Sequence, residues 1–67
     1  MYKLGAIPRD SESQATYETL NDVFGPDDTF SSEEAIEAIS EVHEVSSTTA
    51  QALFWRLTQA GGVLRIG

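Results

Sequence analysis

Residues 30–62 read FSSEEAIEAISEVHEVSSTTAQALFWRLTQAGG, which contains two helix starts, the turn between them and a helix end. Ser31 followed three residues later by Glu34 is a capping box, because each side chain can satisfy a free backbone N–H of the other residue. Phe30 before the cap and Ala35 in the fourth helical position add a weak hydrophobic staple. A helix is therefore predicted to begin directly after Ser31.

The helix that begins after Ser31 has an apolar side and an acidic side. At 3.6 residues per turn, the apolar side is formed by Ala35, Ile36, Ile39 and Val42. The opposite side carries the glutamates at 33, 34, 37, 41 and 44. We expect these glutamates to be solvated, because ligands spread over three turns cannot converge on a metal ion.

The following helix is predicted from Ser46 or Ser47 to Ala60, with Gly61 just past its end. Its apolar side is formed by Ala50, Leu53, Phe54, Leu57 and Ala60. Upstream of the capping box, another helix is predicted over residues 11–24. That helix is marked on one face by Tyr17, Leu20 and Phe24, is capped by Asp10 or Ser11, and is stopped by Gly25 and Pro26.

Short β-prone segments lie outside the helices. Val63–Ile66 alternates in character after the glycine pair, and its partner is predicted to be either Tyr2–Ile7 or Thr29–Phe30. Because a two-stranded ribbon is marginal by itself, this sheet should pack on the helices.

Together these elements predict a single α+β domain over residues 1–67, with three helices and a small two- or three-stranded sheet. A domain of this size buries only about 60% of the surface that its unfolded chain exposes, so its packing must be efficient. The predicted core comprises Tyr17, Leu20, Phe24, Phe30, Ile36, Ile39, Val42, Leu53, Phe54, Leu57 and Val63.

The order helix, short strand, helix, tight turn, helix, strand resembles the winged helix-turn-helix family. FSSEEAI at residues 30–36 resembles the start of the family's second helix, and VSSTTAQALFWRLTQAGGVLR at 45–65 resembles its turn, recognition helix and wing strand. The family's inward-facing positions and its glycine are matched by Ala50, Phe54, Leu57 and Gly61. The resemblance covers about residues 11–67 and concerns the fold, which serves many binding tasks.

Two features depart from the family pattern. The turn His43-Glu44-Val45 lacks the glycine often found there. The sequence also stops at Gly67, where the family turns through a wing and returns on a second strand. We expect the N-terminal segment to supply the missing strand, and a truncated wing is the alternative.

The resemblance implies a DNA-binding surface on the outward side of the third helix, formed by Ser47, Thr48, Gln51, Ala52, Trp55 and Arg56. Hydroxyl groups at a helix start can contact phosphates, glutamine can read adenine, and arginine can read guanine or phosphate. Lys3, Arg9 and Arg65 would add positive charge from the two ends of the chain. Trp55 lies almost opposite Leu53 on the helical wheel, which predicts an exposed indole that could anchor an interface. The alternative is that the ring folds back against the N-terminal strand and is partly buried.

Charge is strongly segregated along the chain. The eleven acidic residues lie between Asp10 and Glu44, the four basic residues lie outside that span, and the formal net charge is −7. This acidity either repels nucleic acid and attracts a basic partner, or forms a solvated surface typical of proteins from a very salty cytoplasm. We expect the segregation to persist in space, with the four cations and Trp55 near one side.

The sequence contains no pattern typical of an enzyme, a cofactor site or a metal site. There is no cysteine, no phosphate-binding glycine loop and no nucleophile–histidine–carboxylate set. His43 is the only histidine, and it is either a pH sensor beside Glu41 and Glu44 or an inert turn residue. No apolar run approaches the roughly 20 residues that span a bilayer, so we expect a cytoplasmic protein without a membrane partner.

The leading hypothesis is therefore a small DNA-binding or transcription-associated protein that acts by binding double-stranded DNA. The alternative is a protein–protein interaction module on the same fold, which would use Trp55, Gln51, Ala52 and an exposed terminal strand. A homodimer formed through edge strands is compatible with either hypothesis.

Overall fold

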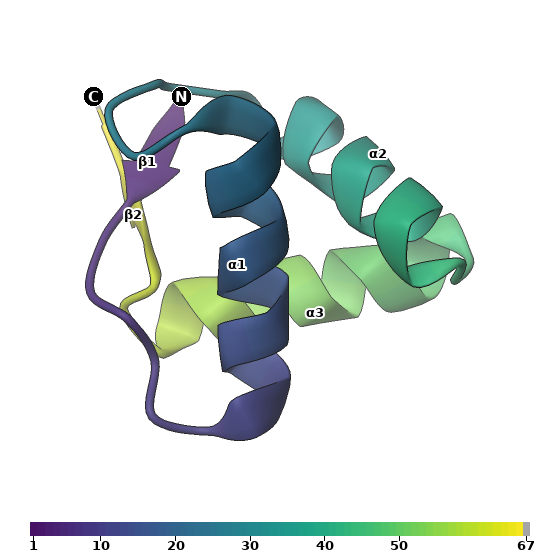
Figure 1. The fold of residues 1–67 in the computed structure, drawn as a ribbon. Coiled ribbons are helices and arrows are strands. Elements are labelled where there is room, and N and C mark those ends of the chain that lie inside the picture. The colour runs from purple at the N-terminus through teal and green to yellow at the C-terminus, as the bar shows by residue number, and fades with distance from the viewer. Residues whose placement is uncertain (67) are drawn as a thin grey trace.

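The computed structural model describes residues 1–66, which form β1 (Tyr2–Leu4), α1 (Ser11–Phe24), α2 (Ser32–His43), α3 (Ser47–Gln59) and β2 (Val63–Arg65). The two strands lie beside α1 on the side away from α2, and α3 crosses α1 (Figure 1). The expected α+β arrangement of three helices and a small sheet is confirmed. Gly67, the last residue of the predicted domain, lies outside the described residues.

Capping side chains define the helix starts where the sequence predicted them. Ser31 Oγ accepts the Glu34 N–H and Glu34 Oε1 accepts the Ser31 N–H, both at 3.1 Å. The Asp10 carboxylate accepts the Ser13 N–H at 3.0 Å and caps α1, and Ser46 caps α3. These bonds satisfy donors that every helix leaves free in its first turn.

The turn between α2 and α3 is made without a glycine. Glu44 takes the left-handed conformation there, with φ 54° and ψ 48°, at a cost of roughly 1–2 kcal/mol for a residue with a side chain. Ser40 anchors the turn, because its carbonyl accepts the N–H groups of Glu44 and Val45 while its hydroxyl donates to the Val45 carbonyl at 2.6 Å. The missing glycine therefore does not prevent a tight connection between the two helices.

The N-terminal strand occupies the middle of the sheet. β1 pairs antiparallel with β2 in the register Tyr2↔Arg65, Lys3↔Leu64 and Leu4↔Val63. On the other side of β1, Tyr2 and Phe30 exchange two backbone hydrogen bonds of 2.8 and 2.9 Å. The predicted pairing of the two chain ends is confirmed, and the segment before α2 joins them through a single bridge.

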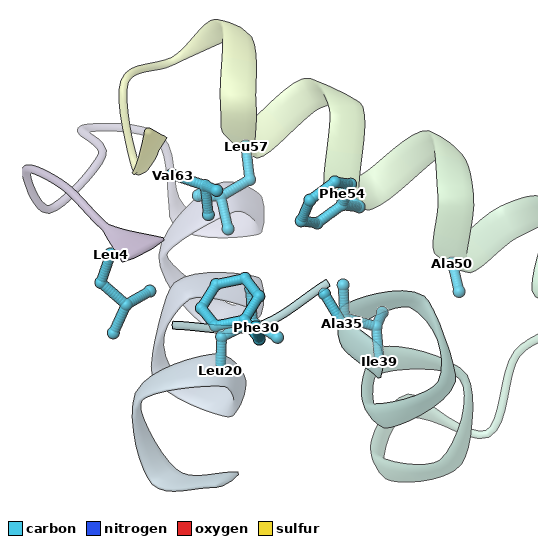
Figure 2. Close-up of a cluster of buried hydrophobic side chains, with 9 residues drawn as sticks. All are labelled: Leu4, Leu20, Phe30, Ala35, Ile39, Ala50, Phe54, Leu57 and Val63. Carbon is cyan, nitrogen blue, oxygen red and sulfur yellow. The ribbon is translucent and has the colours of Figure 1, made fainter. Parts of the chain in front are cut away.

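Phe30 lies in the middle of a core that draws on every element (Figure 2). Its members are Leu4, Leu20, Phe30, Ala35, Ile39, Ala50, Phe54, Leu57 and Val63. Four predicted core residues, Tyr17, Phe24, Ile36 and Leu53, pack against this cluster and are only partly buried. Phe24 stacks on Phe30 with ring centroids 4.7 Å apart.

The prediction that Val42 belongs to the core is wrong, because its side chain is 58% exposed. Val42 continues the helical stripe of Ala35 and Ile39, but at this end of α2 the side chain that contacts a neighbouring helix is His43, whose Nε2 lies 2.8 Å from Thr19 Oγ1 of α1. Leu4 is buried instead, although it was not predicted in the core. Its burial depends on the pairing of β1 with β2, which places Leu4 opposite Val63.

The buried side of α1 is lined largely by hydroxyl residues. Ser13, Thr16 and Thr19 are buried together with Leu20. Thr16 Oγ1 donates to the Glu12 carbonyl at 3.3 Å, and Thr19 Oγ1 donates to the Ala15 carbonyl at 3.0 Å. Because the helix backbone satisfies both threonine hydroxyls, they can lie at a helix contact that a search for apolar periodicity overlooks.

Candidate functional site

The candidate site is the outward side of α3. This helix buries Ala50, Phe54 and Leu57. In the close-up, Ala50 and Phe54 lie on the side of α3 that faces α2 (Figure 2). The residues assigned to a DNA-binding surface in the sequence, namely Ser47, Thr48, Gln51, Ala52, Trp55 and Arg56, are all exposed. We call these six residues the α3 face. No acidic residue occurs in α3, so the helix adds no carboxylate to this face.

Trp55 is both exposed and braced. Its side chain is 41% exposed, as its wheel position predicted. Its ring also makes edge contacts with Tyr2 and Phe54, at centroid distances of 6.3 and 5.2 Å. Tyr2 in turn contacts Phe54 at 5.2 Å, so the N-terminal strand holds the indole against the helix. The α3 face therefore presents to solvent the edge of an aromatic cluster formed by Tyr2, Phe54 and Trp55.

Arg56, the only charged residue of α3, is engaged in an ion pair. Its Nη1 lies 3.0 Å from Glu12 Oε2 at the start of α1, and this is the only ion pair among residues 1–66. Both side chains are more than half exposed, at 57% and 56%, so the pair contributes about 0.2–1 kcal/mol. The pKa of Asp10 lies below its ordinary value of 3.8, mainly because the Ser13 N–H donates to it, with a smaller contribution from Arg56.

The structure separates the remaining cations. Opposite residues of an antiparallel pair share a face and neighbours along a strand alternate, so Lys3 and Arg65 point to opposite faces of the sheet. Arg65 shares the face of Tyr2, whose ring contacts Trp55, and it therefore lies on the α3 side. Arg9 is exposed in the segment before α1. Lys3 therefore does not join Arg65 on the α3 side of the sheet.

Acidic residues approach the α3 face at its N-terminal end. An open hollow of about 410 Å³ is lined by Ser47 of α3 and by Glu33, Ile36, Glu37, Ser40 and Glu41 of α2. Sequence reasoning placed these glutamates on a solvated side of α2 and Ser47 on another helix. Only the packing of the two helices brings the three carboxylates beside Ser47.

His43 ties the end of α2 to α1. Its Nε2 lies 2.8 Å from Thr19 Oγ1, whose own proton is donated to the Ala15 carbonyl. The hydroxyl oxygen therefore accepts from His43, and this assigns the imidazole proton to Nε2. The geometry gives His43 a structural role at the interface of two helices.

The fold and this surface together define a small three-helix α+β domain that presents to solvent one helix side without a carboxylate of its own and an aromatic edge. No known protein family, curated protein or solved structure matches the chain. Within residues 1–66, no helix has the length and apolar character needed to cross a membrane. The same part of the chain holds no group of three histidine, cysteine, aspartate or glutamate side chains placed to bind a metal ion.

Proposed function

We propose that this chain is a winged helix-turn-helix-type domain that binds double-stranded DNA through the α3 face and acts in transcription by binding alone. The observation that carries the proposal is the exposure of this face on the second of two helices joined by a tight turn. In a chain of net charge −7, it is a helix side without a carboxylate of its own. That arrangement is how helix-turn-helix proteins offer a helix to the major groove.

The side chains of the α3 face suit the chemistry of a DNA groove. Ser47 and Thr48 lie at the start of the helix, where hydroxyls and free N–H groups contact phosphates. Gln51 is one turn further on and can pair with both N6 and N7 of adenine. Arg65, on the sheet face beside Tyr2, adds a cation at the edge of the same surface.

Electrostatics limits the strength of this binding. With four Lys and Arg side chains in the whole chain, the slope of log K against log salt can reach only about −3.6. Glu33, Glu37 and Glu41 line the same hollow as Ser47, and their negative charge opposes a close approach of phosphates there. Binding should therefore depend mainly on hydrogen bonds and apolar contacts of α3, and it should lose less affinity in salt than that of a strongly basic domain.

The first test is a titration of labelled random and genomic duplexes, followed by anisotropy at several salt concentrations. The only tryptophan of the chain, Trp55, lies on the α3 face, so its emission should change on binding. An Arg56→Ala/Arg65→Ala variant should bind more weakly than a Lys3→Ala/Arg9→Ala control with the same net charge. If low salt reveals no binding, or if the two variants bind equally, the proposal is wrong.

The braced indole also favours a second candidate function, a protein-binding module that uses Trp55, Gln51 and Ala52. Exposed aromatic side chains held rigid by neighbours are frequent anchors of protein interfaces. The terminal strand adds to this candidate, because within residues 1–66 the sheet gives β2 one strand neighbour, β1, and Leu64 and Ile66 are exposed. If the chain binds none of the duplexes but its Trp55 emission changes with protein concentration, the α3 face forms a homodimer instead.

A further inference from the structure

We propose that Glu12 is a positioning residue that competes with DNA phosphate for Arg56. This inference rests on the proposed DNA-binding function and names a device that regulates the same surface. Glu12 is 44 positions from Arg56 in the sequence, and the fold alone brings their side chains to 3.0 Å. Since Arg56 is the only charged residue of α3, this one contact neutralises the positive charge of the α3 face.

The pair is well placed in the unbound protein. Glu12 lies in the first turn of α1 and Arg56 in the last turn of α3, and each helix dipole favours the charge found there. Asp10, which caps α1, also contributes to the negative field around the guanidinium. A phosphate that approaches the α3 face therefore competes with Glu12 for the Arg56 guanidinium.

The exposure of both side chains makes this displacement possible. An ion pair that is more than half exposed on each side is held by about 0.2–1 kcal/mol, which corresponds to about a 1.5- to 5-fold effect on affinity. Glu12 thus lowers DNA affinity without closing the site. While Glu12 holds Arg56, one phosphate fewer is neutralised on binding. The slope of log K against log salt is then shallower by about 0.9.

The test compares Glu12→Gln with Glu18→Gln in the same duplex titration. Both variants remove one negative charge from an exposed position of α1, but Glu18 makes no ion pair within residues 1–66. Glu12→Gln should bind about 1.5- to 5-fold more tightly than Glu18→Gln, with a salt slope steeper by about 0.9. Both differences should disappear when Arg56→Ala is added to each variant.

A stability measurement separates this role from a merely structural one. Loss of the ion pair should leave the melting temperature of Glu12→Gln equal to or below that of the native chain, while its affinity rises. Equal affinities and slopes for Glu12→Gln and Glu18→Gln would overturn the inference and leave the DNA-binding function standing. Binding by Glu12→Gln alone would support both proposals, and absence of binding in every variant would overturn both.

Discussion

The Asp10 carboxylate caps α1 and also makes the stability of the folded chain depend on pH. It accepts the Ser13 N–H at 3.0 Å and so caps α1, and this bond holds its pKa below the ordinary value of 3.8. A group whose pKa is lowered by folding stabilises the folded state above its ordinary pKa. That contribution is lost as the pH falls through the lowered value, so it belongs to the acid limb of the stability curve.

Asp10→Asn should therefore make the stability of the chain less dependent on pH at acidic pH. Asparagine keeps the capping oxygen but carries no charge, so the variant retains the cap and loses its titration. Between about pH 5 and about pH 2, the native chain should lose more melting temperature than Asp10→Asn does. Thermal unfolding followed by circular dichroism measures this. Asp27→Asn, in a loop, is the control, and parallel curves for native and Asp10→Asn chains would contradict the prediction.

At the scale of the elements, helix ends and helix faces differ in how far the sequence alone predicts them. The two residues of the capping box, Ser31 and Glu34, are three positions apart, so the sequence alone predicts it. The structure contains both of its hydrogen bonds. The buried side of α1 was harder to predict, because Ser13, Thr16 and Thr19 carry the contact and only Leu20 belongs to the apolar pattern. Hydroxyl residues give no apolar signal, and the hydroxyls of Thr16 and Thr19 are satisfied by carbonyls of their own helix.

Ser31→Ala should lower the free energy of unfolding by about 1 kcal/mol, because it removes the acceptor for the Glu34 N–H. In a domain of this size, that loss lowers the melting temperature by about 4–8 °C. Ser32→Ala is the matched control, since Ser32 is the first helical residue and makes no capping bond. If the two variants melt together, α2 does not depend on this cap.

At the scale of the whole molecule, the sheet joins the first and last described residues. The Ile66 N–H donates to the Met1 carbonyl at 2.8 Å, and β1 lies between β2 and Phe30. The same strand delivers Leu4 to the core and Tyr2 to Trp55. The core and the candidate site therefore share one support, so loss of β1 should affect both.

Leu4→Ala should destabilise the entire domain by about 2–5 kcal/mol, because Leu4 is only 8% exposed and its loss leaves a cavity. Domains of this size have a total stability of roughly 3–10 kcal/mol. Urea unfolding should be followed by circular dichroism for the helices and by Trp55 emission for the α3 face. The two transitions should shift together, whereas Lys3→Ala, on the outer side of the same strand, should shift neither. A change in emission alone would show that β1 folds independently of the helices.

Some features of the candidate site follow from local sequence, and others depend on contacts between distant residues. The exposure of Trp55 follows from its position on α3, and the sequence predicted it. The pairing of Arg56 with Glu12 and the approach of three glutamates to Ser47 were not predicted. Each of these joins side chains on different helices, whose relative placement is not encoded in any local pattern.

By itself, the sequence determined the helix starts, the helix ends and the α+β class, because caps, glycines and apolar periods act within a few residues. It left two partners open for the C-terminal strand, and the tertiary structure pairs that strand with β1. Only the tertiary structure decided that Val42 stays exposed while Leu4 is buried, since burial depends on which element covers a side chain. It also decided that Lys3 and Arg65 lie on opposite faces of the sheet and that Arg56 faces a carboxylate. Segregation along the chain therefore does not keep every cation apart from the acidic residues, because the neighbours of a charge are set by packing as well as by sequence order.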